Sequence, residues 1–209
     1  MYKYPVIVFE GIETSGKSTN LKIVAKYLNN INRKFIKIRE PGGTTLSEIF
    51  RKLILNKKSK LNFKTDLMLI MASRSENIDK IIKNNYGKKI IIIDRFVDST
   101  IAYQHYGMGI NLNLINKLNN FLLDRFKPTF TFLSIVNKKN MKIRLNKRFS
   151  LNKYDKFDLS FYNKVQKGFL NIAKDKKNYF IIDSNENNIE ENSQIIIKNL
   201  SRPIANENK

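Results

Sequence analysis

A glycine-rich stretch near the amino terminus has the residue types and spacing of a loop that binds phosphate groups. Residues 11–18 match the pattern G-x-x-x-x-G-K-[ST]. Gly11 and Gly16 allow backbone conformations that turn successive N–H groups toward an anion, and a helix beginning near Lys17 would add its own free N–H groups. Lys17 would then contact the outer phosphates, and the Ser18 hydroxyl would help to hold Mg²⁺. The alternative is a glycine turn between unrelated elements.

Three charged residues further along are candidates for the same chemistry. Asp94 and Arg95 follow the apolar run Ile90–Ile93, which is typical of a parallel strand buried on both faces. Open α/β sheets bind ligands at the carboxyl ends of such strands, where Asp94 could orient Mg²⁺ or cap a helix. Arg74 lies within a helical apolar pattern and would need an anionic partner if buried. An exposed helix face is its alternative.

The last candidate cations lie between residues 144 and 157. Arg144, Lys147 and Arg148 are three or four residues apart and share one face of an expected helix. A polar segment around Lys153 follows without any apolar period. We call residues 144–157 the lid, because a basic, weakly packed segment of this kind suits a lid over phosphates. A solvated surface is the alternative.

The remaining pattern predicts the elements that must position these residues. Apolar β-branched runs predict strands, and apolar residues at helical spacing predict helices. Their alternation predicts an α/β fold with a doubly wound parallel sheet, a single kinase-like domain over residues 1–203 and a frayed polar tail over 204–209. The expected strands are 6–10, 35–38, 90–93, 129–136 and 179–182, and the expected helices are 17–30, 46–54, 65–83, 112–123, 141–149, 161–173 and 189–200.

The composition limits the class of protein. The chain has 209 residues, no cysteine and a net charge of +21, which excludes disulfides and thiolate metal sites. No apolar run reaches the roughly 18 residues that span a bilayer, and no signal-peptide pattern precedes the first strand, so we expect a cytoplasmic protein without a membrane partner. The excess lysine is spread along the chain, which indicates compositional bias more than a nucleic-acid-binding face.

Several separated motifs together resemble one family, the thymidylate kinases. They are the segment Phe9–Thr19, the sequence Arg39-Glu40-Pro41-Gly42-Gly43-Thr44, the pair Asp94-Arg95 with Ser99–Gln104 behind it, and the aromatic positions between Phe161 and Ala173. The resemblance spans nearly the whole chain. It implies a nucleoside monophosphate kinase fold, transfer of a phosphoryl group from ATP to dTMP with Mg²⁺, a place in dTTP synthesis for DNA, and a homodimer.

The resemblance also implies a role for individual residues. Arg95 would bind the acceptor phosphate with help from Arg39, and Asp94 and Ser18 would serve Mg²⁺. Because Thr14 is not arginine, the chain resembles the members whose assisting arginine lies in the lid. The ATP-binding residues would be Gly11, Ile12, Glu13, Thr14, Ser15, Gly16, Lys17, Ser18 and Thr19; the dTMP-binding residues Glu13, Arg39, Ile70, Arg74, Arg95, Thr100, Tyr103 and Gln104; and the lid cations Arg148 first, then Arg144 and Lys153.

The chain departs from the family pattern at several positions. Ile70 stands where a phenylalanine usually stacks on thymine, and Lys153 where arginine is common. These changes leave open another nucleotide or deoxynucleoside kinase on the same fold. A phosphate-loop ATPase acting on nucleic acid would explain the charge, but no sequence motif for nucleic-acid recognition supports it. A non-catalytic nucleotide sensor would leave the arginines without a role.

Overall fold

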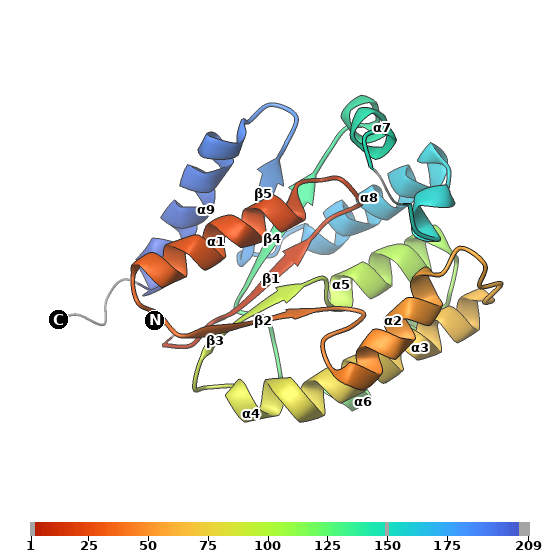
Figure 1. Ribbon diagram of the computed structural model, residues 1–209, viewed down its shortest axis with the longest axis horizontal. Coiled ribbons are helices and arrows are strands. Elements are labelled where there is room, and N and C mark those ends of the chain that lie inside the picture. The colour runs from red at the N-terminus through yellow and green to blue at the C-terminus, as the bar shows by residue number, and fades with distance from the viewer. Residues whose placement is uncertain (1–2, 149–150, 205–209) are drawn as a thin grey trace.

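The strands form a single parallel sheet. The computed structural model describes residues 3–148 and 151–204. Within them, five strands pair in the order β2-β3-β1-β4-β5, and each pairing is parallel (Figure 1). The strands are β1 (Val6–Glu10), β2 (Phe35–Arg39), β3 (Ile90–Asp94), β4 (Phe130–Ile135) and β5 (Tyr179–Asp183). The predicted doubly wound α/β fold is confirmed.

Helices cover both faces of this sheet. In Figure 1, α1 and α9 lie together on one side, and α2, α3 and α6 lie on the other. The helices are α1 (Lys17–Asn30), α2 (Thr45–Leu55), α3 (Phe63–Asn77), α4 (Lys83–Asn85), α5 (Val97–Thr100), α6 (Leu112–Leu123), α7 (Lys138–Asn146), α8 (Leu159–Ala173) and α9 (Ile189–Ile204). None of the described helices is long and apolar enough to cross a membrane.

The central strands are buried because both faces of the sheet are covered. Ile90–Ile93 are fully buried, and alternate members of this run pack into different apolar clusters. On one face, Phe9 stacks on Phe132 beside α1 and α9. On the other, the strands pack against a helical segment that includes Ile78 and Ile82. The core therefore holds the carboxyl ends of β1 and β3 side by side, where the site residues begin.

Two helical regions differ from the prediction. The expected helix 65–83 begins at Phe63, because Asn62 caps it by accepting a hydrogen bond from the Thr65 N–H. It passes through a π-helical turn, Ile78–Ile82, and ends with α4.

Residues 97–107, for which no element was expected, form α5 and a second π-helical turn, Ile101–Gly107. This unexpected helix carries Thr100, Tyr103 and Gln104, three of the residues predicted to bind the acceptor nucleoside.

The carboxyl end of the chain is ordered further than expected. Ile204, the first residue of the expected frayed tail, belongs to α9 and is buried against the core cluster beside α1. Residues 205–209 lie outside the described residues, as do Phe149 and Ser150 within the lid. The helix predicted over 141–149 is α7, which begins at Lys138 and ends at Asn146.

Candidate active site

The phosphate-binding loop connects β1 to α1, as the sequence predicts. Gly11 has φ 135°, and a Cβ at this position would lie 2.2 Å from the Ser134 carbonyl oxygen. Gly16 adopts the left-handed conformation directly before α1. A side chain at position 11 would therefore clash with β4, and at position 16 the backbone conformation itself favours glycine. The helix that follows directs its free N–H groups and the positive end of its dipole toward the loop.

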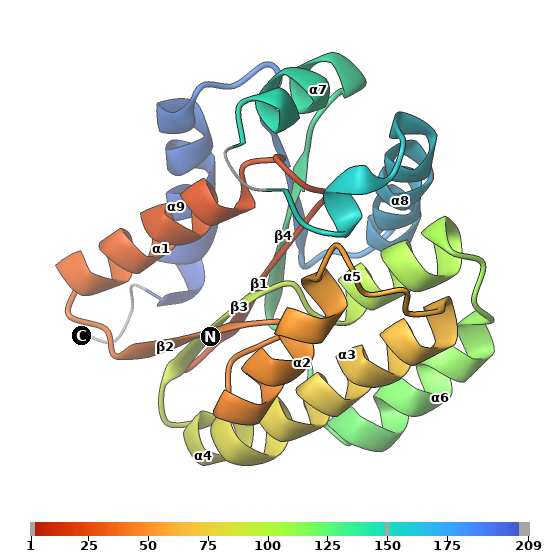
Figure 2. The same ribbon diagram turned by 45° about the vertical axis from the view of Figure 1, so that its right-hand side comes forward.

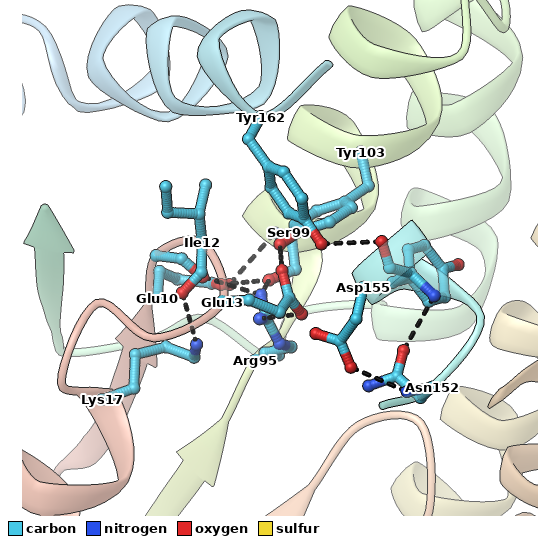
Figure 3. Close-up of polar contacts among 12 residues, drawn as sticks. Glu10, Ile12, Glu13, Lys17, Arg95, Ser99, Tyr103, Asn152, Asp155 and Tyr162 are labelled. Atoms are coloured by element: carbon cyan, nitrogen blue, oxygen red, sulfur yellow. Dashed lines mark hydrogen bonds and ion pairs between the residues drawn. The ribbon is translucent and has the colours of Figure 1, made fainter. Parts of the chain in front are cut away.

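Lys17 lies buried beneath this loop. Its Nζ donates a hydrogen bond to the Ile12 carbonyl oxygen at 3.1 Å (Figure 3). Burial and the nearby Arg95 guanidinium lower the pKa of Lys17 to about 8, although Asp94 and Glu13 oppose the shift. An anion in the loop would favour the charged amine and raise this pKa. Lys17 is thus positioned to contact a bound phosphate.

Arg95 forms the centre of a network at the end of β3. Its Nη1 donates to the Gly11 carbonyl oxygen at 2.8 Å, and its Nη2 pairs with Glu13 Oε1 at 2.8 Å. Glu13 also accepts a hydrogen bond from the Tyr103 hydroxyl (Figure 3). Burial opposes charge on Glu13, but Arg95 and Lys17 outweigh it and hold its pKa below the usual value. Glu13 therefore fixes a guanidinium beside the phosphate-binding loop.

Glu10 is a site carboxylate that sequence reasoning missed. Its Oε1 accepts from the Phe96 N–H at 2.8 Å and the Ser99 N–H at 3.2 Å, and its Oε2 accepts from the Ser99 hydroxyl. Burial, with a contribution from Asp98, raises the pKa of Glu10 to about 7. Glu10 thus holds the turn that positions Arg95. The sequence did offer a signal for this role, because Glu10 is a charged residue at the end of an otherwise apolar strand.

Asp94 and Ser18 have the chemistry to bind a magnesium–nucleotide complex. Both line the cavity described below, and Asp94 Oδ1 is buried without a hydrogen-bond partner among the described residues. Those residues contain no group of three or more His, Cys, Asp or Glu side chains that could hold a metal ion by itself. Mg²⁺ often binds through one or two protein ligands plus substrate phosphates and water, so the residues present fit such an ion.

Arg74 is buried and paired within the protein. Its side chain is 1% exposed. Its Nε donates to Glu40 Oε2 at 2.8 Å, its Nη2 to Thr100 Oγ1 at 2.9 Å and its Nη1 to Asn119 Oδ1 at 2.5 Å. The anionic partner that a buried arginine requires is therefore Glu40, which follows β2. These contacts fix the guanidinium in one orientation at the cavity wall.

One cavity of about 1000 Å³ brings most of the predicted residues together. It includes Asn187–Glu190 at the start of α9, and Arg51, Leu55 and Tyr154, none of which sequence reasoning singled out. Gly11 and Ile12 are buried and do not line it. The predicted residues that line it are Glu13, Thr14, Ser15, Gly16, Lys17, Ser18, Thr19, Ile70, Arg74, Asp94, Arg95, Thr100, Tyr103, Gln104, Arg144 and Arg148.

Two predicted cations do not line this cavity. Arg39 forms a two-point contact with Glu48, at 3.1 and 2.7 Å, and its side chain is 53% exposed. Arg51, one helical turn beyond Glu48 in α2, lines the cavity instead and donates to the Pro41 carbonyl oxygen at 2.7 Å.

Lys153 is not among the residues that line the cavity and pairs with the buried Asp66 at 2.9 Å. In both cases a carboxylate from another segment determines where the cation lies.

The two lid arginines have different surroundings. Arg144 donates to the Thr14 carbonyl oxygen at 3.0 Å and to the Ser184 carbonyl oxygen at 2.8 Å, so it joins the phosphate-binding loop to the segment after β5. Arg148 is 40% exposed and contacts Asp155 at 2.5 Å. Arg144 is thus held by oxygen atoms of two other segments, whereas Arg148 is partly exposed, lines the cavity and pairs with a carboxylate whose own side chain is buried.

Comparisons with known proteins agree with this geometry. The sequence model of the family described as thymidylate kinase matches residues 9–196. The thymidylate kinase of Sulfurihydrogenibium sp. (strain YO3AOP1) is 35% identical over 94% of this chain and 96% of its own. That of Ehrlichia chaffeensis (strain ATCC CRL-10679 / Arkansas) is 43% identical over 80% of this chain and 82% of its own.

A solved structure extends the likeness to the fold. The crystal structure of thymidylate kinase from Ehrlichia chaffeensis has a TM-score of 0.77 and 37% sequence identity, and the match covers 95% of this chain and 98% of that one. Sequence, fold and site geometry therefore lead to the same conclusion: this chain belongs to the thymidylate kinase family.

Proposed function

We infer that the chain transfers the γ-phosphoryl group of ATP to the phosphate of dTMP, giving dTDP and ADP. The observation that best supports this is the shared cavity, which is lined both by the phosphate-binding loop and by Arg74, Thr100 and Gln104. Phosphoryl transfer needs the donor and acceptor phosphates in line within one enclosed space. A cavity that joins the phosphate-binding loop to Arg74, Thr100 and Gln104 has room for both nucleotides and so supports the proposal.

Cations around the cavity supply the catalysis in this proposal. Lys17 and the N–H groups of residues 11–19 bind the ATP phosphates, and Arg95 binds the acceptor phosphate. Arg148 stabilises the negative charge that spreads over the transferring group. No strong general base is needed, because a phosphate monoester with its second pKa near 6 is already largely dianionic at neutral pH. Electrostatic stabilisation therefore accounts for most of the rate.

Residues for Mg²⁺ and for the acceptor nucleoside complete the proposed site. Ser18 and Asp94 hold Mg²⁺, which neutralises phosphate charge when bound. On the acceptor side, Arg74, Thr100 and Gln104 contact thymine, and Ile70 packs against it. Glu13 and Tyr103, joined by their hydrogen bond, lie beside the deoxyribose.

A coupled ADP-release assay tests the proposed function. ATP and Mg²⁺ are held constant while dTMP, dUMP, dCMP, dGMP, AMP and thymidine are compared as acceptors. We expect the highest kcat/KM with dTMP and little turnover with thymidine, since in this proposal Arg95 binds an acceptor phosphate that thymidine lacks. Preference for another monophosphate would move the function to a neighbouring kinase, and DNA-stimulated hydrolysis without an acceptor would overturn it.

We also propose a homodimer, formed through an apolar face on α2, α3 and α6. These three helices lie side by side (Figure 2). Their exposed apolar side chains include Leu46, Ile49 and Leu53, which share one face of α2, and Phe121, which is 83% exposed. Several large apolar side chains exposed on neighbouring helices are typical of a protein–protein interaction surface. A second copy of the chain would bury this face.

The cellular role follows from the product. dTDP is one phosphorylation away from dTTP, so we propose that the reaction supplies DNA synthesis and takes place in the cytoplasm. We do not propose nucleic acid as a partner, because the 39 lysine and arginine residues are spread along the whole sequence rather than grouped in one segment. The positive field of the molecule would instead help to attract anionic nucleotides.

A further inference from the structure

Asp66 of α3 is a fully buried carboxylate to which the proposed mechanism assigns no role. Its Oδ1 pairs with Lys153 Nζ at 2.9 Å. Its Oδ2 accepts from the Tyr154 hydroxyl at 2.6 Å and from Gln104 Nε2 at 3.4 Å. One carboxylate therefore connects the segment around residues 153–154 with the side chain expected to recognise the acceptor base.

Tyr154 is held firmly in this arrangement. Its backbone carbonyl accepts from the Tyr162 hydroxyl at 2.7 Å, and the neighbouring Lys153 N–H donates to the Leu55 carbonyl oxygen at 3.0 Å. Figure 2 shows this turn, in cyan, next to the end of α2. Burial and the adjacent Asp66 raise the pKa of Tyr154 well above its usual value. Its hydroxyl therefore remains a donor to Asp66 across the physiological range of pH.

The network determines the orientation of the Gln104 amide. A carboxylate oxygen accepts hydrogen bonds and does not donate them, so only the NH₂ end of an amide can face Asp66. Gln104 Nε2 also lies 3.3 Å from the Tyr154 hydroxyl oxygen, whose proton is given to Asp66. With its NH₂ end held there, Gln104 presents Oε1 as the group that remains to accept a hydrogen bond.

This orientation has a consequence for the acceptor base. Gln104 lines the cavity together with Ile70 and Thr100. An amide oxygen accepts from an N–H group, which thymine has at N3, and it repels the N3 lone pair of cytosine. Because isoleucine at position 70 offers no aromatic ring for stacking, recognition depends more on hydrogen bonds of this kind.

We propose that Asp66, together with Tyr154, is a positioning residue that holds Gln104 with Oε1 toward the acceptor base and so selects a pyrimidine bearing N3–H. The inference rests on the proposed function, since it concerns the acceptor side of the same cavity. It adds that specificity arises partly from Asp66, a buried residue that is not among those lining the cavity.

The primary test is Asp66→Asn, which keeps the shape of the side chain. Asparagine presents both a donor and an acceptor, so Gln104 can take either orientation. We expect the dissociation constant for dTMP to rise about three- to tenfold, the loss of roughly one hydrogen bond. The constant for dCMP should stay the same or fall, and that for ATP should not change. Calorimetric competition titrations measure all three.

A second variant keeps the inference testable if Asp66→Asn does not fold. Tyr154→Phe removes the hydroxyl from both Asp66 and Gln104 while keeping the ring, and should lower the dTMP-over-dCMP preference in the same direction. Tyr179→Phe is the matched control, because the Tyr179 hydroxyl also donates to a buried carboxylate, that of Asp98. It should reduce stability without changing the preference between the two nucleotides.

The outcomes separate the inference from the function on which it rests. If the wild-type protein binds and phosphorylates dTMP, but folded Asp66→Asn or Tyr154→Phe keeps the wild-type preference, the positioning role is wrong and the function stands. Equal weakening of dTMP and dCMP would also overturn it, since a purely structural role affects both. A wild-type protein without preference for dTMP would overturn the proposed function and the inference together.

Discussion

At the scale of single residues, the site depends on charges kept in a low-dielectric environment. Lys17, Glu13 and Arg95 are close enough to shift one another's pKa values. Burial disfavours charge on each of them. The Glu13 carboxylate offsets this for Arg95, whose pKa is raised. Electrostatic stabilisation is larger in such a site than in water, which suits a reaction that stabilises phosphate charge.

The first prediction concerns Lys17. We expect Lys17→Ala to lower kcat by about 10³-fold or more, because one cation contacting the transferring phosphate can supply that much. The ADP-release assay measures the loss, and circular dichroism controls for folding. Near-normal turnover by a folded Lys17→Ala protein would show that the loop does not bind the reacting phosphates.

The second prediction separates the two lid arginines. Arg148→Ala should lower kcat more than it raises the KM for dTMP, because Arg148 would act chiefly in the transition state. Arg144→Ala, in contrast, should lower thermal stability, because Arg144 donates hydrogen bonds to Thr14 and Ser184 within the fold. If Arg148→Ala changed only KM, its assignment to the transition state would be wrong.

The third prediction follows from the pKa of Glu10. The pKa of Glu10 is about 7 in the folded protein, well above the usual value for a glutamate of about 4.5. The folded state therefore binds more protons than the unfolded state between these values, and this stabilising contribution is lost as pH rises through 7. Relative to Glu10→Gln, wild-type protein should gain on the order of 1–3 kcal/mol in free energy of unfolding from pH 8 to pH 5. Urea unfolding at several pH values measures this difference, and a pH-independent difference would contradict it.

At the scale of elements, the site is built where parallel strands end and helices begin. β1 leads into the phosphate-binding loop, β3 into Asp94 and Arg95, and β2 into Glu40. The helical segment that contains Tyr103 and Gln104 packs against α8. Glycine residues in both helical segments allow the segments to pack closely, because a larger side chain would clash with the opposite segment.

The fourth prediction tests that close approach. A Cβ on Gly168 of α8 would lie 2.6 Å from the Tyr106 ring. Alanine in a helix normally gains about 0.5–1 kcal/mol over glycine, but overpacking of this kind costs about 1–3 kcal/mol. We therefore expect Gly168→Ala to lower the free energy of unfolding and raise the KM for dTMP, because Tyr103 lies in the displaced segment. Both effects should shrink when Tyr106→Ala is added, and stabilisation by Gly168→Ala alone would contradict the prediction.

At the scale of the whole molecule, the sheet has two different sides. One side is covered by α1 and α9, which pack on the sheet and form a continuous apolar core with it. The outer surface of α2, α3 and α6 on the other side retains large exposed apolar side chains. Since the acceptor side of the cavity is built partly on α2 and α3, a subunit interface there would also stabilise the site.

The fifth prediction concerns this surface. Phe121→Asp places a charge on the proposed interface and should convert the dimer to a monomer, because burying an unpaired carboxylate is costly. Light scattering at micromolar concentration measures the change in mass. Asn116→Asp, which adds the same charge at an exposed position about 140° around α6 from Phe121, is the control and should leave the mass unaffected. A wild-type protein that is already monomeric would refute the proposed dimer.

Much of the fold and part of the site followed from the sequence alone. The positions of the strands, the phosphate-binding loop and Asp94-Arg95 were predicted because each depends on residues adjacent in the chain. The glycine spacing sets the loop, and a run of isoleucines ends at the sheet edge. The backbone preferences of glycine and the apolar pattern of a single segment indicate such features before any tertiary contact is known.

Only the tertiary structure decided which partner each long side chain takes. Arg39 pairs with Glu48, Lys153 with Asp66 and Arg74 with Glu40, and Arg51 lines the cavity where Arg39 was expected to act. Arg74 and Lys153 pair with buried carboxylates, where an unpaired charge would be costly, whereas Arg39 pairs with Glu48 at the surface. Most of these partners lie on different elements, so the pairing depends on packing between segments that no local pattern in the sequence describes.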